Sequence, residues 1–146
     1  MLVAIQEAEK ALLLGYKPFG ACVVKNKSVV SSSFNLVKQS LDITAHAEVE
    51  AIKIACRNLN TLNLSGCTLF TTCEPCLMCI GLCFWAKIST LYYGINIDDA
   101  IKYDSRQLNI STKKICEIGF ENIKIEGGLL RNEILDLFSK WKSNQT

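Results

Sequence analysis

The sequence contains no apolar run that approaches the roughly 18 residues needed for a membrane-spanning helix. Its first ten residues also lack the unbroken apolar stretch of a secretory signal peptide, because Glu7 and Glu9 interrupt it. We therefore expect a soluble, cytoplasmic protein that makes no membrane contact.

Long blocks of like charge are absent as well. The 16 basic and 14 acidic residues give a net charge of +2, without the electrostatic footprint that nucleic-acid-binding proteins usually carry. This balance favours a small-molecule substrate. It leaves open an RNA-binding patch that forms only in the folded chain.

Internal repeats, linkers and low-complexity segments are also missing, which predicts one domain over residues 1–146. The chain is 49% hydrophobic and long enough to bury a core without disulfide bonds. Eight cysteines in a protein that is not secreted are expected to be reduced or metal-bound.

Hydrophobic periodicity predicts helices that alternate with strands. The alternation indicates an α/β sandwich, with helices packed on a central sheet. The helix over 75–87 is apolar nearly all round, which is typical of a buried, central helix. The predicted helices span 2–14, 45–58, 75–87, 98–108 and 129–142, and the predicted strands span 21–24, 28–33, 67–72, 88–94 and 122–126.

Four of the cysteines are concentrated in residues 72–83, at the spacing C-x2-C-x2-C-x3-C. Two metal sites are compatible with this spacing. In the first, Cys76 and Cys79 bind zinc together with a distant ligand, because residues at i and i+3 lie on one helix face. In the second, Cys73, Cys76, Cys79 and Cys83 all bind an iron-sulfur cluster.

His46 is the only histidine, and Glu48 stands two residues after it at a predicted helix start. A solitary histidine is more often structural than a ligand. Residues two apart on a helix point about 200° apart, so both serve one site only if it lies off the helix end. The helix N-terminus favours thiolate there. Three ligands leave a fourth position open for water, as in catalytic zinc sites, and Glu48 would carry its proton.

The iron-sulfur alternative is weaker. Phe84 occupies the position after the last cysteine, where that motif has proline, and no second cluster motif exists. It would also leave His46 and Glu48 without a role. Cys73 and Cys83 are better interpreted as small apolar residues, as are Cys22, Cys56, Cys67 and Cys116.

His46-Ala47-Glu48 followed by Pro75-Cys76-x-x-Cys79 resembles the signature of the zinc-dependent cytidine deaminase superfamily. Further segments are similar to its purine-directed branch, which contains guanine deaminases and tRNA adenosine deaminases. These segments are Pro18 to Ala21, Asn35, Thr44 to Ile52, Cys73 to Cys79 and Trp85 to Ile88, within residues 1–95.

The resemblance implies a three-layer α/β/α sandwich around a five-stranded mixed sheet. It implies one Zn²⁺ per chain held by His46, Cys76 and Cys79, with Glu48 moving the proton during hydrolytic release of ammonia. It also implies a homodimer. The residues expected to bind substrate are Asn35, Phe19, Ala47 and Trp85.

The substrate is expected to be a purine, and guanine first. Phe84 to Ile88 is similar to guanine deaminases, and residues 98–105 match another of their elements in part, which makes Asp104 a candidate second proton carrier. Residues 127–135 are more similar to tRNA adenosine deaminases. The segment 138–144, with two lysines and Trp141, carries little charge for gripping phosphates. The alternative substrate is adenosine at the tRNA wobble position; a non-catalytic zinc or iron-sulfur protein is the different-class alternative.

Overall fold

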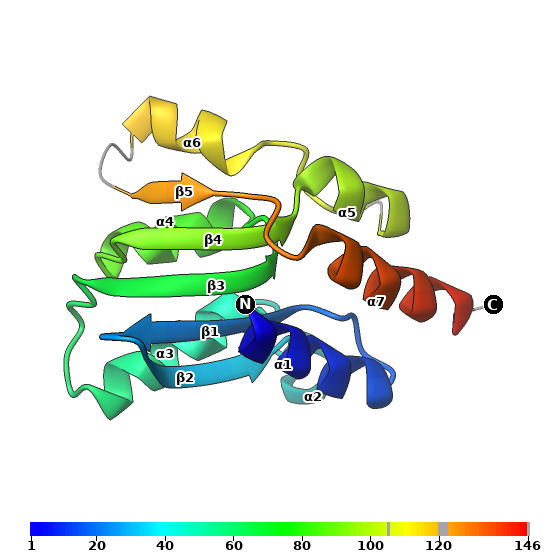
Figure 1. Ribbon diagram of the computed structural model, residues 1–146, viewed down its shortest axis with the longest axis horizontal. Helices are drawn as coiled ribbons and strands as arrows, with labels where there is room; N and C mark the ends of the chain where they lie inside the picture. The colour runs from blue at the N-terminus through cyan, green and yellow to red at the C-terminus, as the bar shows by residue number, and fades with distance from the viewer. Residues whose placement is uncertain (105, 120–122, 146) are drawn as a thin grey trace.

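The computed structural model describes residues 1–104, 106–119 and 123–145. A five-stranded sheet forms its centre, in the order β2-β1-β3-β4-β5 (Figure 1). β1 pairs antiparallel with β2 and β3, whereas β3, β4 and β5 run parallel, so the expected mixed sheet is confirmed. The strands are β1 (Gly20–Lys25), β2 (Ser28–Phe34), β3 (Cys67–Cys73), β4 (Thr90–Ile95) and β5 (Lys124–Glu126).

Helices cover both faces of the sheet, which confirms the three-layer arrangement. In Figure 1, α1 and α7 lie in front of the sheet, and α3 and α4 lie behind it. Each layer buries its own apolar cluster, one around Ile52 and Ile80 and the other around Ile134 and Phe138. The helices are α1 (Leu2–Leu13), α2 (Val37–Ser40), α3 (Ala47–Asn58), α4 (Leu77–Trp85), α5 (Ile97–Tyr103), α6 (Thr112–Gly119) and α7 (Arg131–Ser143).

The parallel pairing of β3 with β4 requires a crossover, and α4 supplies it. β3 therefore ends at Cys73 at the same edge of the sheet where α4 begins. α3 also begins at this end of the sheet, so the N-termini of α3 and α4 meet beyond the carboxyl end of β3.

Several elements differ from the sequence prediction. α2 and α6 were not expected: α2 has only four residues, too few for a periodic apolar stripe, whereas the eight-residue α6 was missed although its sequence is amphipathic. α5 ends at Tyr103 and does not reach residue 108. α4 is not buried all round: Cys79, Ile80 and Cys83 are buried, whereas Leu77, Met78, Phe84 and Trp85 are exposed. Asn122, the predicted start of β5, lies outside the described residues.

α5 and α7 are joined by a two-pronged ion pair. Arg131 donates from Nε to one oxygen of Asp99 at 2.9 Å and from Nη2 to the other at 2.8 Å. Asp99 is buried, with 3% of its surface exposed, so this geometry is well fixed. The pair therefore joins the first turn of α5 to the first residue of α7.

None of the helices in the described ranges combines the length and the apolar character that crossing a membrane requires.

Candidate metal centre and active site

Two predicted ligands occupy N-cap positions. His46 precedes α3 with φ −66° and ψ 156°, and Cys76 precedes α4 with φ −69° and ψ 172°. Neither side chain caps its own helix, so both project beyond the helix ends. Small buried residues, Ala47 and Ala51 on α3, share one apolar cluster with Cys83 on α4 and let the two helices approach closely.

The three ligand atoms fit a tetrahedral zinc ion. The Sγ atoms of Cys76 and Cys79 are 3.7 Å apart, and His46 Nδ1 lies 3.8 Å from the first and 3.5 Å from the second. With Zn–S of about 2.3 Å and Zn–N of about 2.0 Å, tetrahedral geometry requires about 3.8 Å between sulfurs and about 3.5 Å from nitrogen to sulfur. His46, Cys76 and Cys79 are therefore placed to bind one metal ion.

The same three side chains share protons when no metal holds them. A hydrogen bond from the Cys79 thiol, opposed by burial and aided by His46, lowers the pKa of Cys76 to about 4. The pKa of Cys79 rises, because that hydrogen bond and burial both favour its thiol. The hydrogen bond to Cys76 raises the pKa of His46. Binding of a divalent metal would displace the protons of Cys79 and His46.

Glu48 lies on the first turn of α3 and points into the same site. Only 6% of its surface is exposed. Burial is the main effect on this carboxyl and raises its pKa, while His46 opposes the rise. Its role as the proton carrier stays a prediction.

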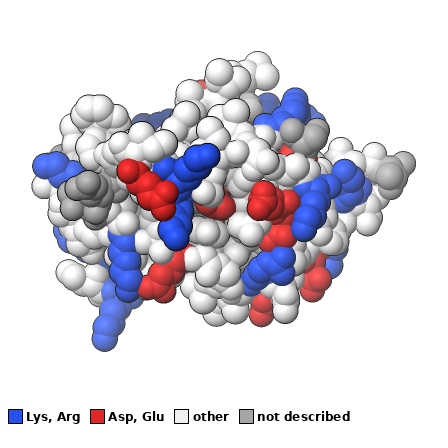
Figure 2. Space-filling model, turned by 90° about the horizontal axis from the view of Figure 1, so that it is seen from above, with Lys and Arg blue, Asp and Glu red and all other residues white. Residues whose placement is uncertain are grey.

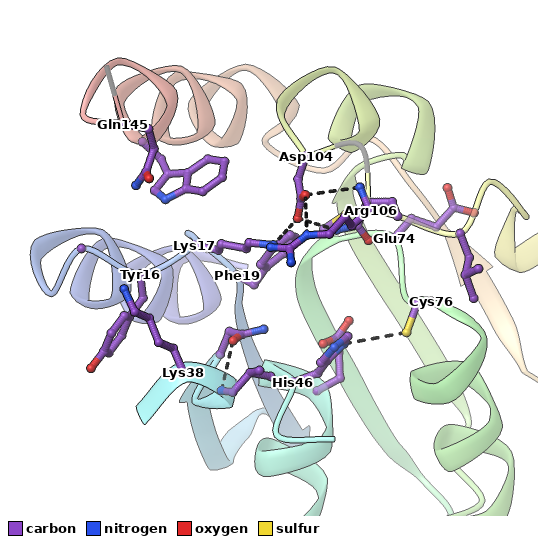
Figure 3. Close-up of a pocket in the computed structure, with 18 residues that line it drawn as sticks. Tyr16, Lys17, Phe19, Lys38, His46, Glu74, Cys76, Asp104, Arg106 and Gln145 are labelled. Atoms are coloured by element: carbon purple, nitrogen blue, oxygen red, sulfur yellow. Dashed lines mark hydrogen bonds and ion pairs between the residues drawn. The ribbon is translucent and has the colours of Figure 1, made fainter. Parts of the chain in front are cut away.

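A cavity of about 780 Å³ opens over these residues. His46, Glu48 and Cys76 are among its lining residues. Figure 3 shows His46 and Cys76 facing each other across the site. Its volume is within the range of small-molecule sites, and it lies at the carboxyl end of β3, where α/β proteins commonly bind ligands.

Two of the four predicted substrate-binding residues line this cavity. Phe19 packs edge-on against Phe138, with ring centroids 5.2 Å apart, which fixes one wall. Asn35 accepts a hydrogen bond from the Val37 amide through Oδ1 at 3.2 Å. That contact orients the amide group of Asn35, which also lines the cavity.

The other two are not brought to the cavity lining. Ala47 is completely buried in the core beneath the site. Trp85 stands at the end of α4 with 78% of its surface exposed, in contact with Phe84. Their contact with substrate stays a prediction.

Asp104 does line the cavity, and Lys17 donates a hydrogen bond to it across 87 residues of sequence. Burial raises the pKa of Asp104, but the Lys17 ion pair and the Arg106 amide outweigh it, so the pKa is lowered. The carboxylate is therefore charged at neutral pH. Its role as second proton carrier stays a prediction.

Sequence reasoning missed most of the outer cavity. Glu74 lies within the Cys73 to Cys79 segment, which the sequence analysis searched only for metal ligands. The other missed residues come from the loop after α1, from α2, from the segment after α5 and from the residues after α7, and none of these belongs to a recognisable motif. Pro18-Phe19-Gly20 marks the adjacent loop and is the one signal that pointed there. The missed lining residues include Tyr16, Lys17, Lys38, Glu74, Arg106, Gln107 and Gln145.

Cys73 and Cys83 lie outside the group of atoms that can share the metal. Cys83 is completely buried in the apolar cluster behind the sheet, and Cys73 ends β3 with 3% exposed. Burial raises the pKa of both thiols, as expected for cysteines that act as apolar residues.

Comparison with known proteins supports this geometry. Residues 1–95 match the family described as the cytidine and deoxycytidylate deaminase zinc-binding region. The chain is 45% identical over 83 residues to a guanine deaminase of Bacillus subtilis (strain 168), covering 57% of this chain and 53% of that protein. It is 51% identical over 92 residues to a tRNA-specific adenosine deaminase of Aquifex aeolicus (strain VF5), covering 63% and 61%. The match thus spans between half and two thirds of these curated relatives.

A solved structure extends the likeness to the rest of the chain. It comes from a study of A-to-I editing by tRNA:A34 deaminases at the wobble position of transfer RNA. The structures share a TM-score of 0.82 and 30% identity, covering 94% of this chain and 96% of the other.

Proposed function

Because the chain belongs to the cytidine and deoxycytidylate deaminase zinc-binding family, we propose that it is a zinc-dependent hydrolytic deaminase of purines, with guanine as the favoured substrate. The reaction consumes water and guanine and yields xanthine and ammonia. The observation that carries the proposal is the convergence of His46, Cys76 and Cys79 with the buried Glu48 at the base of a ligand-sized cavity.

Each residue of the site has a defined task. Zinc, when bound by His46 and the two cysteines, supplies Lewis acidity that makes a water molecule reactive near neutral pH. Glu48 takes a proton from the attacking water and returns it to the leaving nitrogen. The buried setting of Glu48 keeps this proton within the site, where bulk water does not compete for it.

The cavity wall would hold the base. Phe19, fixed by Phe138, offers an apolar ring against a purine face. The Asn35 amide, oriented by the Val37 amide, can hydrogen-bond to a ring edge. Guanine is favoured by the sequence of Trp85 to Ile88, which is similar to guanine deaminases.

A tRNA adenosine deaminase is the second candidate, and the outer cavity favours it. Lys17, Lys38 and Arg106 line that part together with Tyr16 and Trp141, a combination of cations and aromatic rings that suits a nucleotide chain. Among the described residues, basic and acidic side chains are interspersed over the face seen in Figure 2, so they form no broad positive surface there for a long RNA contact.

Ammonia release separates the candidates. The zinc-loaded protein is assayed with guanine, guanosine, adenine, adenosine, cytosine, cytidine and an anticodon stem-loop. We expect turnover of guanine that changes little with salt. Turnover confined to the stem-loop, with KM rising steeply with salt, would instead establish the tRNA activity. Release from cytosine or cytidine alone would refute the purine assignment.

We also propose that a second copy of the chain covers α4. Its exposed apolar residues, Leu77, Met78, Phe84 and Trp85, form an unusual concentration for a solvent-facing helix. Sedimentation equilibrium should give about twice the 16.2 kDa chain mass. Trp85→Glu should shift the protein toward the monomer; a monomeric unsubstituted protein at micromolar concentration would contradict this assembly.

A further inference from the structure

Both oxygens of the Glu74 carboxylate bind the backbone of one distant segment. Oε2 accepts a hydrogen bond from the Ile97 amide at 2.9 Å, and Oε1 accepts one from the Thr112 amide at 2.7 Å. All three residues are buried, with exposed fractions of 5% for Glu74, 3% for Ile97 and 0% for Thr112. One carboxylate therefore accepts hydrogen bonds from both ends of the segment 97–112.

The segment held in this way forms a wall of the cavity. It contains α5 and then the lining residues Asp104, Arg106, Gln107 and Leu108. Figure 3 shows Glu74 between Cys76 and the part of the wall that carries Asp104 and Arg106. The position of this wall therefore depends on the two ends that Glu74 holds.

Glu74 is equally tied to the metal ligands, since it lies two residues before Cys76. Its own amide donates to the Ile95 carbonyl at 2.8 Å, and the Thr112 hydroxyl donates to the Pro75 carbonyl at 3.2 Å. Movement of the stretch that carries Cys76 would consequently disturb the wall, and movement of the wall would disturb that stretch.

We propose that Glu74 is a positioning residue that couples the metal ligand Cys76 to the cavity wall 97–112. Zinc binding fixes Cys76 and, through Glu74, orders the wall that surrounds the substrate. By linkage, an ordered wall strengthens zinc binding to the same degree. The kinetic part of this inference rests on the proposed deaminase function, whereas the coupling between metal and wall does not.

Glutamine cannot replace Glu74 in this role. The two amides require two acceptor oxygens, and the glutamine side chain offers one oxygen and one NH₂ group. One buried amide would lose its partner and face a second donor. Since glutamine has nearly the same volume as glutamate, Glu74→Gln removes the paired hydrogen bonds to the two amides and leaves the side-chain packing in place.

Hydrogen exchange measures the coupling directly. In the unsubstituted protein, zinc should slow amide exchange across 98–104 and 106–111 by about fivefold or more, the lower end of typical site-to-site couplings. In Glu74→Gln the zinc effect on these amides should fall below about twofold. Asp98→Asn makes the same chemical change at an exposed carboxyl on α5 and should behave like the unsubstituted protein.

Two further readouts make the test decisive. Zinc affinity, measured by competition with a chelator, should weaken in Glu74→Gln, and KM should rise by about tenfold with kcat changed less than about threefold. If Glu74→Gln does not fold, Glu74→Asp serves in its place, because the aspartate side chain is one methylene shorter and cannot reach the Ile97 and Thr112 amides at once. A zinc effect on the wall equal to that of the unsubstituted protein, in whichever variant folds, would overturn the coupling. Absence of ammonia release by the unsubstituted protein would refute the proposed function and leave the exchange result valid.

Discussion

Glu48→Gln is expected to lower kcat for ammonia release by about 10³-fold while one zinc ion stays bound per chain. Glutamine occupies the same space as glutamate and keeps an acceptor oxygen, but it cannot take up or return a proton. Steady-state ammonia assays, together with metal analysis of the same sample, measure the two effects separately.

Glu50→Gln provides the matched control. Glu50 also lies on the first turn of α3, but its carboxylate pairs with Lys53 at 2.7 Å and does not line the cavity. This variant should keep both zinc and turnover. Activity retained by Glu48→Gln would show that another group moves the proton, and loss of zinc would show that Glu48 supports the metal instead.

Cys79→Ser is expected to weaken zinc binding by more than the roughly 100-fold that loss of a supporting partner costs. The Cys79 thiolate is one of three expected protein ligands. A serine hydroxyl does not ionise near neutral pH, and its oxygen does not extend as far toward the metal as the cysteine sulfur does. Chelator competition followed by elemental analysis measures the change in affinity. Ammonia release should be lost in parallel and should return only with a large excess of zinc.

Cys83→Ala is the control for this substitution. Cys83 belongs to the same run of four cysteines but lies in the apolar cluster behind the sheet, so the variant should lose some stability and keep its zinc. The purified protein should also be colourless. Iron with visible absorbance, or loss of metal in Cys83→Ala, would restore the iron-sulfur interpretation.

The metal ligands were predictable because two of them are only three residues apart and the third is the single histidine of the sequence. Cys76 and Cys79 share one helix face, and the single histidine stands with Glu48 at a helix start. Ligand chemistry therefore left few alternative sets of metal ligands. The family resemblance then identified the set, and the geometry agrees with it: all three ligand atoms lie at tetrahedral spacings.

The cavity wall was not predictable, because it depends on contacts between distant residues. Lys17 and Asp104 are 87 residues apart, and Glu74 binds amides 23 and 38 residues away. No sequence pattern predicts that a carboxylate will bind distant backbone amides. The burial of α4 was overestimated for a related reason: an apolar helix composition does not say whether its own chain or another molecule covers each face.

Zinc-dependent ammonia release is the most direct test of the account. The protein is stripped with a chelator, assayed with guanine and the other purines, and assayed again after addition of one equivalent of zinc. We expect no ammonia release from the stripped protein and restored release at one zinc ion per chain. Undiminished release without metal, or no release from any purine substrate after zinc is restored, would contradict it.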